Sequence, residues 1–184
     1  MVLSQFTSQL NKKTLAAYFS VPKDIYPVGR LDEDSEGLLI LTNDQNLNHR
    51  LLNPLFQHER EYWVQVDGAI TAHAITQLQQ GIEINAHGKN YRTKPCSAYL
   101  FDEIPALPQR NPPVRFRKNI PTSWIKIILT EGKNRQVRKM TAKIGFPTLR
   151  LLRYRIQDLA LGNLKPGEIK ELSRSTVYKK LFHE

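Results

Sequence analysis

Apolar and polar positions follow strand-like and helix-like periods in turn along this chain. Residues 62–67 alternate between the two classes, which predicts a strand with one buried face. Residues 124–129 and 149–156 are strand-like as well, and the continuous apolar run 38–42 favours a buried strand. Short strands are expected to follow one another up to Tyr99.

Helices are predicted where an N-cap residue precedes apolar positions at helical spacing. Asp44 stands before Leu47 and Leu51, which are four residues apart. The same reasoning predicts helices from Thr71 to Gln80, ended by Gly81, over 135–144, and in a shorter form over 13–19.

The segment 102–121 breaks this regularity with five prolines, which exclude a helix and predict a long ordered loop or an extended arm. Strands and helices elsewhere are interspersed without a βαβα rhythm. The expected fold class is therefore α+β with a mostly antiparallel sheet and flanking helices. A length of 184 residues fits one domain, expected to span 1–184.

Charge points to a polyanionic partner. Lys and Arg number 27 against 17 Asp and Glu, which leaves a net charge of +10 and favours binding to nucleic acid. No apolar run approaches the roughly 18 residues that a membrane helix needs, and the N-terminus does not resemble a signal peptide. The single cysteine, Cys96, excludes an internal disulfide and fits a reducing cytoplasm. The five histidines lack paired ligand spacing, so no metal site is expected among them.

Two segments concentrate groups that carry chemistry. The loop Gly29-Arg-Leu-Asp-Glu-Asp-Ser-Glu-Gly37 places four carboxylates in five positions. No glutamate stands at the twelfth position of an EF-hand begun at Asp32. The predicted helix over 135–144 carries a basic face with Arg135, Arg138 and Lys139. An arginine from that face would keep a loop carboxylate ionised in a dry pocket.

Taken together, Gly29-Arg-Leu-Asp32, Asp34-Ser-Glu-Gly-Leu-Leu, Tyr62-x-Val64 and Gly132-x-x-Arg-Gln-Val-Arg-Lys-Met140 resemble the pseudouridine synthases of the RsuA type. The stretches Arg110-Asn-Pro-Pro113 and Ile120-Pro-Thr-Ser-Trp-Ile-Lys126 further resemble the RluE branch, whose members modify large-subunit (23S) ribosomal RNA.

The resemblance implies roles for five residues. Asp32 matches the catalytic aspartate, Tyr62 a tyrosine that packs against the target base, and Arg138 the basic residue that pairs with the aspartate. Arg30 matches an arginine near the space that the flipped nucleotide leaves, and Leu152 a hydrophobic pocket wall. Because uridine is only rearranged, neither a metal nor a cofactor is expected.

The resemblance also implies two halves of one catalytic domain flanking a cleft. It implies no S4-type RNA-binding module, and the family's opening strand with a Lys-Pro motif is absent here. Nothing in the sequence demands more than a monomer. The residues expected to contact ribosomal RNA are basic: Arg30, Arg110, Arg115, Arg117, Lys118, Lys133, Arg135 and Lys139.

Two other functions stay open on the residues alone. The chain could be a non-catalytic RNA-binding or ribosome-assembly protein, although a pure binder has no use for a carboxylate that repels RNA. It could also be a metal-dependent nuclease that uses Asp32, Asp34 and Glu36, which loss of activity with a chelator would reveal.

Overall fold

The computed structural model describes residues 2–9, 11–86, 88–114 and 118–184. Its central sheet has the strand order β10-β9-β4-β8-β7, and each of these neighbours is antiparallel. A sixth strand, β2, pairs with β9 in parallel. The strands are β2 (Glu36–Gly37), β4 (Arg60–Asp67), β7 (Ser97–Leu100), β8 (Thr122–Leu129), β9 (Thr148–Ile156) and β10 (Leu159–Ala160). The expected α+β fold with a mostly antiparallel sheet is confirmed.

Smaller elements surround this sheet. Two further strand pairs are β1 (Tyr26–Pro27) with β3 (Leu41–Thr42), and β5 (Glu83–Ala86) with β6 (Lys89–Arg92). The helices are α1 (Gln45–Leu52), α2 (Ala72–Gln79), α3 (Gln136–Lys143) and α4 (Arg174–Phe182), with single 3-10 turns at Leu15–Ala17 and Pro54–Phe56.

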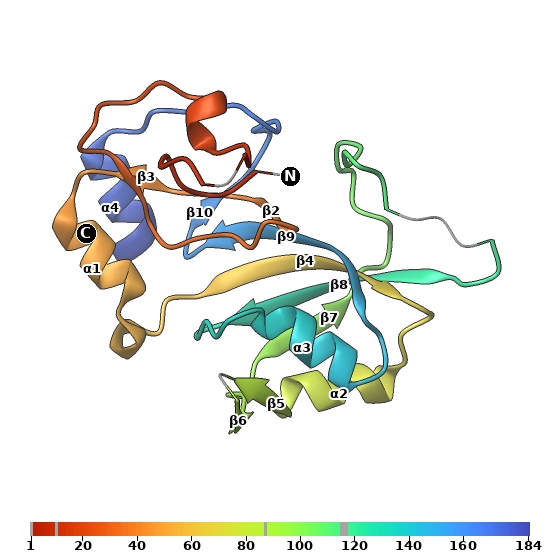
Figure 1. The fold of residues 1–184 in the computed structure, drawn as a ribbon. Coiled ribbons are helices and arrows are strands. Elements are labelled where there is room, and N and C mark those ends of the chain that lie inside the picture. Colours follow the sequence, from red (N-terminus) through yellow and green to blue (C-terminus); the bar gives the residue numbers. More distant parts are fainter. Residues whose placement is uncertain (1, 10, 87, 115–117) are drawn as a thin grey trace.

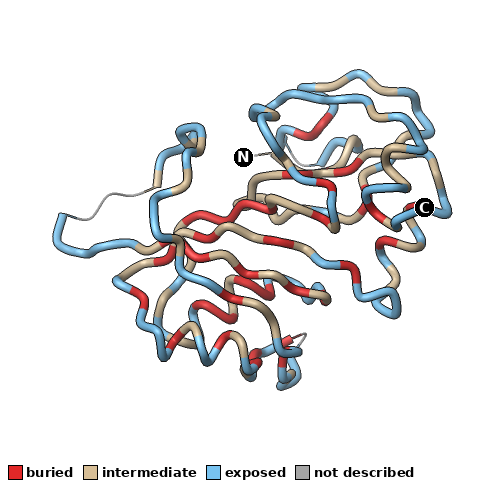
Figure 2. Tube along the Cα trace, turned by 180° about the vertical axis from the view of Figure 1, so that it is seen from behind, coloured by how far each residue is buried: buried red, intermediate tan, exposed pale blue. Residues whose placement is uncertain are grey.

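One hydrophobic core lies between the sheet and the two helices α2 and α3, which cover the same face (Figure 1). Even-numbered residues of β4, Val64 and Val66, point into this core and are fully buried. Leu78 of α2 and Met140 of α3 close over them. The buried positions of this half lie along the strands and the inward sides of the helices (Figure 2).

A second core occupies the other end of the molecule, where both termini lie (Figure 1). Leu47 and Leu51 of α1 pack there with Leu181 of α4. Strand β9 serves both cores, because it contributes Leu151 to the first and Ile156 to the second. The loop between β1 and β3 is thereby placed where the two halves meet on β9.

Most predicted elements are confirmed, including the caps. Asp44 accepts a hydrogen bond from the Leu47 amide at 3.0 Å, and Thr71 caps α2 in the same way. The predicted strand 38–42 is wrong, since only 41–42 form a strand there, and the predicted helix 13–19 shrinks to one 3-10 turn. Helix α4 was not predicted.

The segment 102–121, called the arm below, has no helix or strand in its described residues, as the prolines predict. Residues 102–114 of the arm rise from the sheet on the side opposite α2 and α3 (Figure 1). Within the described ranges, none of the helices has the length and apolar character needed to cross a bilayer.

Gly37 allows β2 to approach β9, which generates a stability prediction. Its φ is +110°, and a Cβ there would lie 2.3 Å from the Arg153 carbonyl oxygen. Gly37→Ala should therefore lower the free energy of unfolding by more than ~2 kcal/mol. Gly162→Ala is the control, because its φ is also positive but nothing lies near the added Cβ. Urea unfolding followed by tryptophan fluorescence measures both, and equal losses would contradict the close approach.

Candidate active site

The acidic loop is held in place at both ends. Its turn is closed by the Ser35 amide, which donates to the Asp32 carbonyl at 2.9 Å, and β2 then pairs with β9. On the other side, the buried hydroxyl of Ser4 donates to the Leu31 carbonyl and accepts from the Leu31 amide, both at 2.9 Å. The N-terminal segment therefore fixes the backbone next to Asp32.

The basic helix α3 begins at a turn built around a buried carboxylate. Glu131 accepts hydrogen bonds from the Gln136 side chain at 2.6 Å, from the Lys94 amide at 2.9 Å and from the Tyr91 hydroxyl. This short bond to Glu131 raises the pKa of Tyr91 to about 12. Arg135 follows in the left-handed region with φ +52°, which a non-glycine residue rarely adopts. The start of α3 is thus positioned by polar contacts to β6 and the segment after it.

Two arginines at the start of α3 bind Asp34. Arg135 binds its carboxylate with both Nη atoms, at 2.9 and 2.8 Å. Arg138 donates to the Asp34 carbonyl at 2.7 Å and to the Ser35 hydroxyl at 3.3 Å, and its Nε lies 3.4 Å from the carboxylate. The hydrogen bonds from Arg135 hold the pKa of Asp34 below its usual value against the opposing effect of burial.

Asp32 lies beside the same two arginines. Among the described residues, Arg135 forms an ion pair with it, and its Nη1 lies 3.7 Å from Oδ2 of Asp32. The resemblance assigned this pairing to Arg138, which in the structure is bound to Asp34 and Ser35. Burial lowers the pKa of Arg138, while the charges of Asp34 and Asp32 raise it. Arg138 therefore lies within the field of Asp32, and Arg135 makes the direct contact.

Glu36 connects the loop to two more arginines. Arg150 of β9 donates to both carboxylate oxygens, at 3.0 and 2.8 Å. Arg110 of the arm approaches the same carboxylate with its Nε at 3.1 Å from Oε1. Sequence reasoning missed Glu36 and Arg150 as partners, because their positions are 114 residues apart.

Tyr62 and Arg153 stand opposite each other on β4 and β9. Tyr62 is half-buried against the first core, and Arg153 is buried with its Nε donating to the Leu38 carbonyl at 2.9 Å. The Nη2 atom of Arg153 has no hydrogen-bond partner among the described residues. Burial lowers the pKa of Arg153, and Tyr62 opposes that shift. Leu152, next along β9, is buried in register with Glu36 and Trp63.

The residues expected to bind RNA divide into exposed and engaged groups. Arg30, Lys118 and Lys133 are exposed, and the Lys133 ammonium also lies 4.8 Å from the centre of the Tyr91 ring. Lys139 is half-buried. Arg110 and Arg135 are already engaged with carboxylates of the loop. Arg115 and Arg117 lie outside the described residues.

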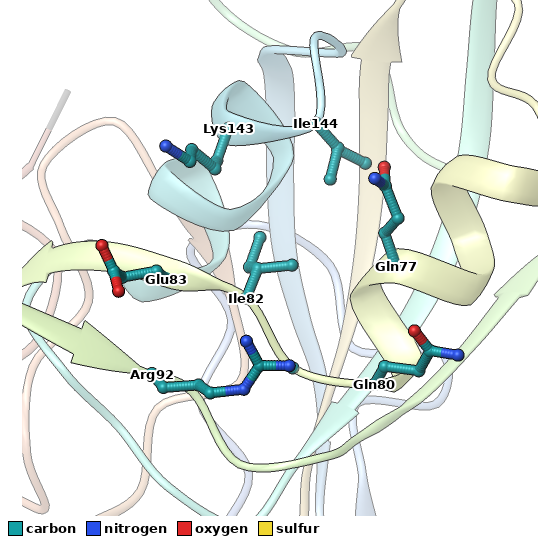
Figure 3. Close-up of a pocket in the computed structure, with 8 residues that line it drawn as sticks. Gln77, Gln80, Ile82, Glu83, Arg92, Lys143 and Ile144 are labelled. Carbon is teal, nitrogen blue, oxygen red and sulfur yellow. The ribbon is translucent and has the colours of Figure 1, made fainter.

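A recess elsewhere on the molecule is separate from this site. It is formed at the end of α2, the beginning of β5 and the end of α3, and Gln77, Ile82, Arg92 and Lys143 line it (Figure 3). None of the residues described above as part of the candidate site lines it. The described part of the chain contains no group of three His, Cys, Asp or Glu side chains that could hold a metal ion.

Cys96 behaves as a packing residue, as expected from the sequence. Its Sγ donates to the Leu78 carbonyl at 3.2 Å, and burial raises the pKa of the thiol to about 11. At neutral pH it is therefore a protonated and weakly nucleophilic group.

The known proteins that are similar to this chain all point to one family. The family model described as RNA pseudouridylate synthase matches residues 4–143. The Ribosomal large subunit pseudouridine synthase E of Vibrio parahaemolyticus is 52% identical over 170 residues, which cover 92% of this chain and 69% of the relative. The protein of the same name from Xanthomonas axonopodis pv. citri is 48% identical, with 90% and 85% covered.

Solved structures support the same assignment. A structure described as a crystal structure of pseudouridylate synthase superposes with a TM-score of 0.75 at 25% identity, covering 93% of this chain and 66% of that one. Residues 4–143 include Asp32, Tyr62 and Arg138, so the family match covers the acidic loop and the start of α3 as well as the sheet between them. The chain belongs to the RNA pseudouridylate synthase family.

Proposed function

We propose that this chain converts uridine to pseudouridine in large-subunit (23S) ribosomal RNA and that Asp32 is the essential carboxylate. The names of the relatives from Vibrio and Xanthomonas support this substrate class. The observation that carries the assignment of Asp32 is its place: it is 30% exposed, on an anchored loop, and 3.7 Å from Arg135. It is thus open to a substrate and has a cation beside it.

The reaction requires a correctly positioned carboxylate and few other catalytic groups. The bond from N1 of uracil to C1′ of ribose breaks, the base turns, and C5 bonds to C1′. C5 then loses a proton, and N1 carries one. No electrons pass to a carrier, so we propose no cofactor. Asp32 acts either as the nucleophile, at the sugar or the base, or as the base that removes a sugar proton.

The target uridine must leave the RNA stack before Asp32 can reach it, which costs a few kcal/mol. Tyr62, half-buried on β4, is proposed to pack against the flipped base, and such stacking returns about 1–3 kcal/mol. Arg138 holds the carbonyl of Asp34 and the hydroxyl of Ser35, two and three residues after the proposed catalytic position. Arg30 and Leu152 are proposed to border the vacated space and the pocket.

Binding to RNA is proposed to rest on the exposed basic residues. The net charge of +10 implies that affinity falls steeply with salt, because neutralised phosphates release counterions. Structured ribosomal RNA is read largely through shape and phosphates, and unpaired loops supply specificity. We propose that the chain acts as a monomer, in the cytoplasm where ribosomal RNA is modified, with the two halves flanking a cleft at Asp32.

Asp32→Asn tests the assignment directly. The variant should bind a large-subunit rRNA transcript with parental affinity and lose at least ~1,000-fold in turnover, because the amide can neither attack carbon nor take a proton. Release of tritium from 5-tritiated uridine measures turnover. Asp158→Asn, far along the chain at an exposed pair with His183, is the control and should keep the parental rate. Retained turnover in Asp32→Asn would refute the role, and no release even by the parent would favour the binding-protein alternative.

Arg138→Lys tests whether the guanidinium shape matters. Lysine keeps the charge but cannot reach the Asp34 carbonyl, the Ser35 hydroxyl and the Asp34 carboxylate together. The single-turnover rate at saturating RNA should fall about 10- to 100-fold, as expected when a supporting residue lets a catalytic group shift. Lys143→Arg, on the other end of α3, should leave the rate unchanged. A parental rate in Arg138→Lys would show that the charge alone suffices.

A further inference from the structure

The middle of the arm, at Pro108 and Arg110, is fastened beside the acidic loop at one carboxylate. Arg110 lies 3.1 Å from Glu36, and Arg150 binds Glu36 with two hydrogen bonds. Arg150 also donates to the Pro108 carbonyl of the arm at 2.9 Å. Three segments that are distant in sequence, the loop, the arm and β9, therefore meet at Glu36.

This cluster differs from the surface ion pairs of the molecule in its burial. The side chains of Arg150, Arg110 and Glu36 are 9%, 15% and 25% exposed, whereas both partners of the Lys12–Glu33 pair are at least 36% exposed. Pairs with exposed partners contribute little to stability. Removal of the charge on Glu36 would leave two partly buried guanidinium groups without the anion between them, which is strongly unfavourable.

Glu36 is also close in space to the proposed chemistry. It begins β2, four residues after Asp32. Its pairing with Leu152 fixes its position along β9. Burial lowers the pKa of Arg138, and the positive charge of Arg110 adds to that effect.

Arg110 therefore has a structural partner within the protein. It was expected to bind RNA, but its Nε faces Glu36 and its Nη1 donates to the Pro112 carbonyl at 3.2 Å. The exposed Lys118, further along the arm, remains available for phosphates.

We propose that Glu36 is a positioning residue that holds the middle of the arm against the catalytic loop, so that RNA bound by the arm is presented to Asp32. The inference rests on the proposed function. An arm that is already fixed in the free protein loses little conformational entropy when RNA binds. Loss of the anchor therefore weakens RNA binding and leaves the catalytic groups intact. Loss of the anchor is therefore expected to change KM more than kcat.

Glu36→Gln is the test, because glutamine keeps the size of the side chain and removes its charge. KM for a large-subunit rRNA transcript should rise at least ~10-fold, while kcat stays within about 3-fold of the parent. Glu33→Gln, in the same loop but paired at the surface with Lys12, is the matched control and should change neither constant.

A second readout needs no RNA. Trypsin must take the Arg110 side chain into its own pocket, which Glu36 opposes in the parent. The fragment that ends at Arg110, identified by mass, should therefore form at least ~5-fold faster in Glu36→Gln than in the parent or in Glu33→Gln. Circular dichroism and thermal unfolding verify that the variants remain folded.

The outcomes separate the two proposals. Tritium release by the parent tests the proposed function, and faster cleavage after Arg110 tests the anchor even where no release occurs. A fall in kcat with unchanged KM would overturn the inference by placing Glu36 in the chemical step, and unchanged KM with unchanged cleavage would overturn it as well. Should Glu36→Gln fail to fold, Arg110→Met decides: it leaves the Arg150–Glu36 pair intact and should raise KM, and a parental KM refutes the anchor.

Discussion

The geometry of this site depends on charge pairing between the acidic loop and cations from elsewhere in the fold. Four carboxylates in five positions repel one another and would repel RNA. Three of them meet an arginine brought from another segment: Arg135 for Asp32 and Asp34, and Arg150 for Glu36, whereas Glu33 pairs with Lys12 at the surface. The conformation of the loop is therefore a property of the whole fold, because the N-terminal segment, β9 and the start of α3 all have to be in place.

Arginine suits this role better than lysine. Arg135 and Arg150 each bind a carboxylate with two parallel hydrogen bonds, which fix direction as well as distance. Because the loop is neutralised from within, the large surplus of positive charge stays available on the surface for RNA. A partly exposed carboxylate can then lie on a basic protein without a strong repulsion of the RNA.

Local signals along the chain predict much of the fold. The Asp44 and Thr71 caps, the alternation in β4 and the prolines of the arm act within a few residues, so the sequence displays them directly. The prediction of a strand over 38–42 was wrong. Leu38 and Ile40 are apolar because they are buried in the second core, and they do not belong to a strand. Helix α4 carries only Leu181 as a buried residue, and its weak apolar pattern gave little to detect.

By itself, the sequence determined the α+β class, the family motifs and the candidates Asp32, Tyr62 and Arg138. Tertiary structure alone decided which arginine meets which carboxylate. Arg135 rather than Arg138 contacts Asp32, and Arg110 faces Glu36 inside the protein. The reason is physical: these partners are far apart in the sequence, as the separation of 101 positions between Arg135 and Asp34 shows. Their pairing follows from how β9, α3 and the arm pack, which no local pattern of residues encodes.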